Sequence, residues 1–334
     1  MKMKKFMNDP KTLTKECLEG LAQVHSELIH LEGNALVVSN GLDHAHRVTV
    51  VSQLGSGHEP AMGGFVGQGM LDVAIMGDAF AAPSPFACVD GLKRAERGQG
   101  VLYVVLNHSG DVLSSNLAMN AMRREPDVHV RKVVIQEDIA VVPRVYAQDR
   151  RGMVGGVFAC KIAGAAASQG RPLEEVAAIT QRFADNMATL AVATRSATHP
   201  LTGREITVID DDEMLVGMGI HGEGGGRYYP FLNAHDTVGI MMPRLLEDLG
   251  IMPGENIMLA VDGSGASTIM ELFVIFRAAA AYLAEKGINV VAKYVGELLT
   301  SQEQAGFQLF IARMDDELLE LWNAPCNTPY FKRL

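Results

Sequence analysis

Short β-branched runs alternate along this chain with alanine-rich segments of helical period. Such alternation is typical of βαβ units, in which helices connect neighbouring parallel strands. We therefore predict an α/β fold with mostly parallel or mixed sheets. In the first half, strands are expected over 47–52, 71–76, 101–106 and 131–135, followed by a helix over 156–167.

The chain is long enough for more than one domain. Its 334 residues are over twice the roughly 150 residues of a typical domain, so two α/β domains are expected. A helix over 173–190 would connect them, and we place the boundary near residue 190. This gives an N-terminal domain over 1–190 and a C-terminal domain over 191–334. Other expected elements are a helix over 11–32 and strands over 205–209, 214–220, 256–261 and 289–295.

Charge and cysteine usage exclude several classes of protein. The 39 acidic and 29 basic residues give a net charge of -10, the wrong sign for a groove that binds nucleic acid. The four cysteines have no paired spacing, which favours reduced thiols over a disulfide framework or a zinc site. The basic start lacks the apolar stretch of a signal peptide, and the apolar run 272–284 is too short to span a bilayer. We expect a soluble, cytoplasmic protein without nucleic-acid or membrane partners.

Three expected strands each lead into a glycine-rich turn that carries an ionisable side chain. In open α/β sheets, ligands bind outside the carboxyl ends of the strands. Two of these turns lie in the first half and one in the second, so we expect a ligand site in a cleft between the domains. The turns contain Gly55-Ser56-Gly57-His58, Asn107-His108-Ser109-Gly110-Asp111 and His221-Gly222-Glu223.

His58 and Asp111 each have an ordinary structural explanation beside a functional one. A histidine after Gly-Ser-Gly could cap a turn, although glycines also let backbone N–H groups approach a small polar ligand. Asp111 could form an Asx turn or cap the helix that follows. A carboxylate at a strand end opposite histidines could instead take a proton from an alcohol. The residues alone leave both interpretations open.

His221 lies between glycines, with Glu223 two residues later. A neutral imidazole held there could bind a metal, orient a substrate or act as a nucleophile. A metal is disfavoured because no second histidine or cysteine follows at ligand spacing. The acidic run 210–213 is typical of a solvated turn, and the turn 262–265 lacks the lysine and full spacing of a P-loop. We therefore expect neither a metal nor a nucleotide site on this chain.

Several longer motifs occur in order along the sequence. They are the segments 55–60, 77–85, 107–111, 150–152, 217–223 and 322–325. Together they resemble the substrate-binding K subunit of dihydroxyacetone kinases, and the similarity extends from about Lys5 to Leu334.

The resemblance implies two α/β domains, a homodimer, and a short ketose held between the domains. It matches His221 to a histidine that adds to the ketone as a covalent hemiaminal. This chemistry selects ketoses over glycerol because glycerol has no carbonyl. Asp111 matches the base that takes the proton of the terminal hydroxyl, and His58 matches the histidine that assists both steps. The loop that contacts the sugar is matched by Gly55, Ser56 and Gly57.

The resemblance implies that the reaction is divided between the K subunit and a nucleotide-binding L subunit, or the L domain of single-chain kinases. By resemblance, a separate L subunit holds the nucleotide, which is ATP, or ADP rephosphorylated by a phosphotransferase system, together with Mg²⁺. We therefore expect no cofactor on this chain and an L subunit as its partner.

The chain departs from the family pattern around the expected pocket. Gln53-Leu54 replaces a glycine pair, and Met62 replaces a histidine. Leu106 stands at the substrate-contacting position of a lysine, and the loss of that charged donor favours a four-carbon ketose such as erythrulose. Our leading hypothesis is the substrate-binding subunit of a short-ketose kinase. The alternative is a non-catalytic, ketose-sensing coactivator paralogue of the K subunit.

Overall fold

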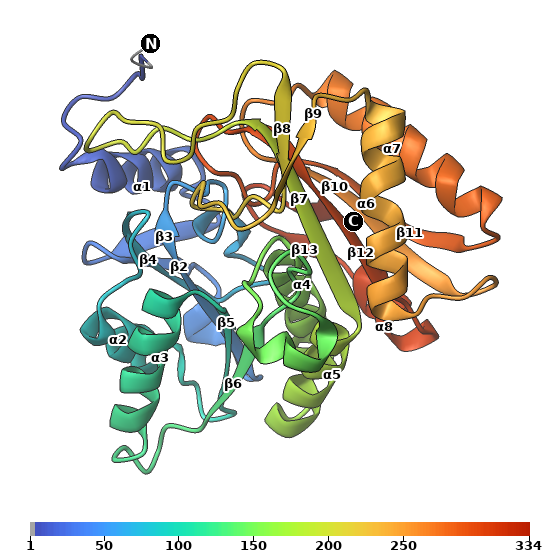
Figure 1. The fold of residues 1–334 in the computed structure, drawn as a ribbon. Helices are drawn as coiled ribbons and strands as arrows, with labels where there is room; N and C mark the ends of the chain where they lie inside the picture. Colours follow the sequence, from blue (N-terminus) through green and yellow to red (C-terminus); the bar gives the residue numbers. More distant parts are fainter. Residues whose placement is uncertain (1–3) are drawn as a thin grey trace. The chain divides into compact units, whose positions relative to one another are not determined.

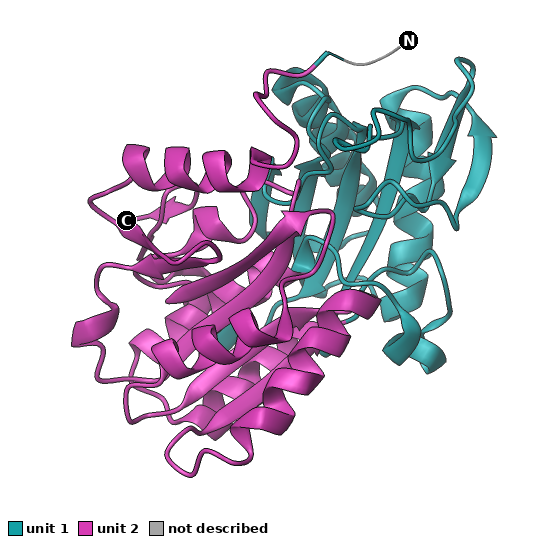
Figure 2. Ribbon diagram, turned by 90° about the vertical axis from the view of Figure 1, so that its left-hand side faces the viewer, with its two compact units in different colours: residues 1–4, 136–155, 185–319 teal, residues 5–135, 156–184, 320–334 magenta. Residues whose placement is uncertain are grey.

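Two six-stranded sheets organise the chain, and each belongs to a different unit (Figure 1). The computed structural model describes residues 4–334. Unit 1 contains Lys4, Gln136–Gly155 and Asp185–Leu319 (Figure 2). Unit 2 contains Lys5–Ile135, Gly156–Ala184 and Glu320–Leu334. The predicted α/β class with mixed sheets is confirmed, and each unit combines segments that are distant in sequence.

The sheet of unit 2 has the strand order β1-β2-β4-β3-β5-β6. The last four strands in this order are parallel, whereas β1 and β2 form an antiparallel hairpin at one edge. The carboxyl ends of β3 and β5 therefore meet at the same edge of the sheet. The bounds are β1 Ile29–Glu32, β2 Leu36–Ser39, β3 Thr49–Ser56, β4 Val73–Ala79, β5 Val101–Leu106 and β6 Val130–Ile135.

Helices cover both faces of this sheet, so its central strands β3 and β5 are buried on both sides. Val101, Tyr103 and Val105 of β5 belong to one apolar cluster with α2 (Pro85–Ala95) and α3 (Ser109–Met122). Leu106, the residue after Val105, points to the other face of the sheet and lies against Gly156 of α4 (Gly155–Ser168). The remaining elements are α1 Leu13–Val24, α5 Leu173–Asp185, α8 Asp316–Asn323, the hairpin β13 Cys326–Asn327 with β14 Lys332–Arg333, and the 3-10 helices η1 Leu42–His44, η2 Gly63–Phe65 and η3 Arg144–Asp149.

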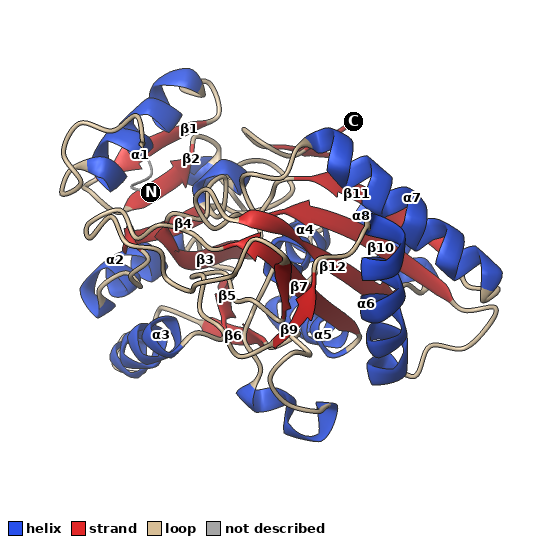
Figure 3. Cartoon of the chain, turned by 45° about the horizontal axis from the view of Figure 1, so that its top comes forward, coloured by secondary structure: helices blue, strands red, loops and turns tan. Residues whose placement is uncertain are grey.

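The sheet of unit 1 has the order β11-β10-β12-β7-β8-β9, and its only parallel pair among the described residues is β10 with β11. The helices α6 (Ala234–Leu249) and α7 (Ile269–Glu285) bury Met241, Leu245 and Leu272 against it. Figure 3 shows the helices and strands in separate colours. The bounds are β7 Met187–Arg195, β8 Glu213–Val216, β9 Arg227–Pro230, β10 Asn256–Gly263, β11 Asn289–Gly296 and β12 Ala305–Arg313.

The segment 136–155 joins unit 1 through backbone pairing. The Ile139 amide donates to the Thr189 carbonyl (3.0 Å), and the Thr189 amide donates to the Glu137 carbonyl (2.9 Å). The Glu137 carboxylate accepts the amides of Met153 and Gly155 within the segment, and it also accepts the Thr189 hydroxyl of β7 (3.4 Å). A boundary near residue 190 would fall inside β7. Each unit is made instead of segments that are separated along the chain.

The strand expected over 214–220 ends at Val216, and the structure differs from the predicted elements in three further places. The helix expected over 173–190 ends at Asp185, and the helix expected over 11–32 ends at Val24, with a strand following each. The segment 205–209 is not a strand, since it makes only the bridge between Thr198 and Glu205. Among the helices of residues 4–334, none has the length and apolar character needed to cross a bilayer.

Candidate functional site

The turn after β3 in unit 2 is built from glycines that the local geometry requires. A Cβ on Gly55 would lie 2.8 Å from the Ala81 carbonyl oxygen, so no side chain fits there. Gly57 has φ +101°, and its amide donates to the Glu59 carboxylate (2.9 Å). The Ser56 hydroxyl donates to the Gly77 carbonyl (2.9 Å) and ties the turn to β4. The turn is thus fixed before any ligand binds.

His58 is held at the end of this turn by packing. Its side chain is fully buried, and its ring lies against Phe80 with the centroids 5.3 Å apart and the planes tilted by 50°. Because a buried imidazole loses much of the rotamer freedom of an exposed one, the ring is presented in a single orientation. This is more constraint than a histidine capping a surface turn requires.

Asp111 lies in the first turn of α3 and is almost fully buried, with 3% exposed. The helix N-cap is His108, so Asp111 is not the capping residue. Its carboxylate accepts a hydrogen bond of 2.9 Å from the Gln53 side-chain amide. Burial raises the pKa of Asp111 to about 6, and the bond from Gln53 acts in the opposite direction. A carboxylate with that pKa is suited to accept a proton near neutral pH.

Leu106 and Met62, the positions where the chain departs from the family pattern, are both fully buried. Leu106 ends β5 and lies against Gly156, where an added Cβ would clash with the leucine side chain. A glycine at this point of α4 therefore makes room for Leu106.

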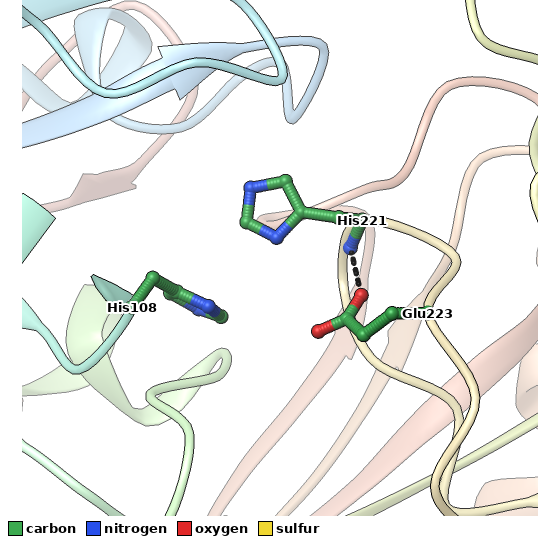
Figure 4. Close-up of side chains that lie close together, drawn as sticks. All are labelled: His108, His221 and Glu223. Atoms are coloured by element: carbon green, nitrogen blue, oxygen red, sulfur yellow. Dashed lines mark hydrogen bonds between the residues drawn. The ribbon is translucent and has the colours of Figure 1, made fainter. Parts of the chain in front are cut away.

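In unit 1, His221 is carried by the loop between β8 and β9. Its backbone amide donates to the Glu223 carboxylate (2.8 Å), as the dashed line in Figure 4 shows. Burial lowers the pKa of the His221 imidazole, Glu223 opposes this shift, and the Arg151 cation adds to it. This shift favours the neutral ring, the state in which one ring nitrogen has a free lone pair.

Arg151 also holds the loop that carries His221. Its guanidinium donates to the Gly217 carbonyl (2.8 Å) and to the buried Asp138 carboxylate (2.7 Å), and it lies 3.4 Å from Glu223. Sequence reasoning included Arg151 only in a motif and did not single out Asp138. The sequence signal for Asp138 was its place three residues after the predicted strand 131–135.

Gly226 offers a test of how tightly the His221 loop is built. A Cβ on Gly226 would clash with the Val216 carbonyl, whereas one on Gly224 has no neighbour within 4 Å. We expect Gly226→Ala to destabilise unit 1 by about 1–3 kcal/mol, the usual cost of overpacking. Gly224→Ala in the same loop is the matched control and should leave the melting temperature unchanged. Equal melting curves for the two variants would show that the loop has room to move.

Two other sequence features have structural explanations. The buried Asp262 carboxylate accepts the Leu298 amide (2.6 Å) and the Gln308 side-chain amide (2.9 Å), so it connects β10 to its neighbours. Burial raises its pKa well above the usual range. The run 210–213 is largely exposed, as expected of a solvated turn.

A cavity of about 440 Å³ in unit 1 is lined mainly by apolar side chains from α6, α7 and the adjacent sheet. The hydroxyl of Thr237 in its wall bonds the Asn233 carbonyl (2.8 Å), and that of Ser267 bonds the Gly306 carbonyl (2.8 Å). None of the candidate residues lines this cavity. Its apolar wall does not suit a small polyol, which needs several hydrogen-bonding partners.

Comparisons with known proteins agree on one family. The model of the Dak1 domain matches residues 19–330. The dihydroxyacetone-binding subunit DhaK of PTS-dependent dihydroxyacetone kinase 1 from Listeria innocua is 34% identical over 315 residues, which cover 94% of this chain and 95% of the relative. The L-erythrulose kinase of Pectobacterium atrosepticum is 33% identical over 98% of this chain, which spans 56% of that longer protein.

The solved structures agree with these sequence relatives. The structure of the dihydroxyacetone kinase operon co-activator Dha-DhaQ superposes with a TM-score of 0.89 and 28% identity, and it covers 96% of this chain and 98% of its own. The family model and these relatives each match most of the chain. The chain therefore belongs to the Dak1 domain family of dihydroxyacetone kinase K subunits.

Proposed function

We propose that this chain is the ketose-binding subunit of a short-ketose kinase. The observation that carries the proposal is the similarity to a dihydroxyacetone-binding subunit over nearly the full length of both chains. The half-buried His221 and the buried Asp111 support it, since a lowered imidazole pKa favours the neutral ring and a raised carboxyl pKa favours proton uptake near neutral pH. The relatives are of the dihydroxyacetone kinase type, so the proposed reaction is phosphoryl transfer to an alcohol.

His221 is proposed to hold the ketose covalently. The lone pair of one ring nitrogen attacks the ketone carbon, a C–N bond forms, and the carbonyl π bond opens to an alkoxide. The proton of the other ring nitrogen ends on that oxygen, which gives a neutral hemiaminal. The lowered pKa of His221 supports this step because a protonated imidazole has no free lone pair. Glycerol has no carbonyl and is excluded.

Asp111 is proposed to act as the base. It takes the proton of the terminal hydroxyl as that oxygen attacks the phosphorus of the donor, and its pKa of about 6 leaves it mostly ionised at pH 7. His58 is proposed to assist both the adduct and the deprotonation, and its fixed orientation against Phe80 supports such a role. The turn of Gly55, Ser56 and Gly57 is proposed to contact the sugar.

The phosphoryl donor is proposed to lie on a partner. An L subunit would bring ATP, or ADP with a phosphotransferase system, together with Mg²⁺, while this chain forms a homodimer. The test is to incubate purified chain, dihydroxyacetone and Mg-ATP with and without an L subunit, and to follow ketose phosphate by ³¹P NMR. Product is expected only when both subunits are present. Ketose phosphate from this chain alone would contradict the division of labour.

A ketose-sensing coactivator is the second candidate function. The structural likeness to the co-activator Dha-DhaQ favours it, since that fold is shared at a TM-score of 0.89. A coactivator would bind ketose and give no phosphate with any L subunit, including one fed by a phosphotransferase system. Ketose binding by calorimetry together with absent turnover would therefore replace the kinase proposal with this one.

Substrate preference follows from Leu106. A lysine there would supply a charged donor, and a hydrogen bond from such a donor contributes about 1.5–3 kcal/mol. Leu106 cannot donate, so we expect erythrulose to compete well with dihydroxyacetone, as judged by kcat/KM with an L subunit. Leu106→Lys should shift the ratio toward the triose, and Leu106→Met, which adds no donor, should not. A strong wild-type preference for dihydroxyacetone would contradict this expectation.

A further inference from the structure

Gln53 is an uncharged polar residue buried inside the apolar face of the unit 2 sheet. It lies near the carboxyl end of β3 and is fully buried. Around it are Tyr103 of β5 and Cys88 of α2, both members of the apolar cluster under α2 and α3. A buried amide costs free energy unless its donors and acceptor all find partners, so its hydrogen bonds define what it does.

The oxygen and the nitrogen of this amide bond to different neighbours. Its oxygen accepts from the Tyr103 hydroxyl and from the Cys88 thiol (3.1 Å). Its nitrogen donates to the Asp111 carboxylate (2.9 Å) and to the Asp111 backbone carbonyl (3.1 Å). The four contacts therefore form a chain from α2 and β5, through Gln53, to the first turn of α3.

This pattern allows only one orientation of the amide. If the group were rotated by half a turn, its oxygen would face both acceptors of Asp111 while its nitrogen faced the thiol and hydroxyl. Two acceptors facing a third one are repulsive in a buried site. The Asp111 backbone carbonyl can only accept, so it sets this orientation, and the donors of Tyr103 and Cys88 fix the amide oxygen on the other side.

We propose that Gln53 is a positioning residue for the candidate base: its amide, fixed by Tyr103 and Cys88, orients the Asp111 carboxylate and favours its ionised form. The proposal rests on the proposed function for the role of Asp111, but the geometry itself does not depend on that role. The bidentate grip on carboxylate and backbone carbonyl fixes both the side chain and the helix turn that carries it.

Among the groups around Asp111, Gln53 contributes most to stabilising the ionised carboxylate. The titratable groups from the neighbouring elements are the Cys88 thiol of α2 and the Tyr103 phenol of β5. Burial raises the pKa of Cys88 to about 11 and that of Tyr103 well above its usual range, so both stay neutral at pH 7. Burial favours the protonated form of Asp111, and the Gln53 bond favours the ionised form.

The test replaces the amide without changing the volume much. Gln53→Met removes both N–H donors, and Tyr103→Phe leaves the amide in place but removes one of the two donors that fix its oxygen. Ser52→Ala is the matched control, because the buried Ser52 hydroxyl of the same strand bonds the Val104 carbonyl (2.9 Å) and does not touch Asp111. Each variant is titrated by ¹³C NMR of aspartate carboxyl groups, with Asp111→Asn used to assign the signal.

We expect Gln53→Met to raise the Asp111 pKa by about one to two pH units, the equivalent of a hydrogen bond to a charged group. Tyr103→Phe should raise it by less, and Ser52→Ala should leave it unchanged. In turnover assays with an L subunit, the acid limb of the kcat profile should move to higher pH in the first two variants. Activity then falls more at pH 6 than at pH 8.

The two readouts separate this inference from the function it rests on. An unchanged Asp111 pKa in both Gln53→Met and Tyr103→Phe would overturn the role of Gln53. If Gln53→Met does not fold, Tyr103→Phe alone decides the matter. A shifted NMR pKa with an unshifted kcat profile would support the positioning by Gln53 and contradict Asp111 as the base.

Discussion

Asp111→Asn is expected to lower kcat by about 10²- to 10⁴-fold in a system reconstituted with an L subunit, the usual contribution of a general base. The amide oxygen of asparagine can still accept the hydrogen bond from Gln53, so the first turn of α3 should stay in place. Ketose binding should remain, since the proposed adduct forms at His221. Single-turnover phosphoryl transfer measured beside ketose binding checks both expectations.

The variant should also be stable, which makes the result interpretable. The pKa of Asp111 is raised in the folded state, so the fold favours the neutral form of this side chain. The ionised carboxylate therefore costs stability above its unfolded pKa, and a neutral isostere removes that cost. Asp90→Asn, on the exposed side of α2, is the control. Turnover of Asp111→Asn near the wild-type rate would mean that Asp111 only supports the helix.

His221→Gln is expected to abolish the covalent ketose adduct. Glutamine keeps a polar side chain of similar size but has no nucleophilic nitrogen, because its amide lone pair is delocalised. Intact-protein mass spectrometry after incubation with dihydroxyacetone should show the added ketose on the wild type and only the bare chain on the variant. Glycerol should add to neither.

His235→Gln controls for histidine reactivity in general. His235 lies in α6 of the same unit and is exposed, so an adduct driven by accessibility alone would appear there first. We expect this variant to add the ketose as the wild type does. A peptide map that places the ketose on any residue other than His221 would remove the basis of the proposed mechanism.

The local sequence pattern was sufficient to predict strands that are buried on both faces of a sheet. The run 101–106 was predicted as a strand and is β5 from Val101 to Leu106, because six consecutive apolar residues, half of them β-branched, have few alternatives. The pattern failed over 187–190, where Ala188 and Leu190 are good helix formers. Pairing with β12, more than a hundred residues later, imposes the strand there.

The candidate residues were found because glycines mark the turns that carry them. Their supports were not, because support depends on three-dimensional contacts. Gln53 was visible only as a departure from a glycine pair, and nothing in the sequence shows that its amide meets Asp111, 58 positions later. Arg151 and Asp138 form another such pair, whose partner Glu223 comes 72 positions after Arg151. Buried polar networks of this kind require the fold before they can be recognised.

Because of the place of β12, the unit 1 sheet can be completed only late in synthesis. This strand lies between β10 and β7, so the middle of the sheet is synthesised after both of its neighbours. Until Ala305–Arg313 emerges, β7 and β10 each expose an unpaired edge, the kind of surface that favours aggregation. Unit 2 waits longer still, because it includes Glu320–Leu334. A nascent chain that stalls after β10 and before residue 305 therefore lacks the middle strand of the unit 1 sheet, whereas all six strands of the unit 2 sheet have already been made.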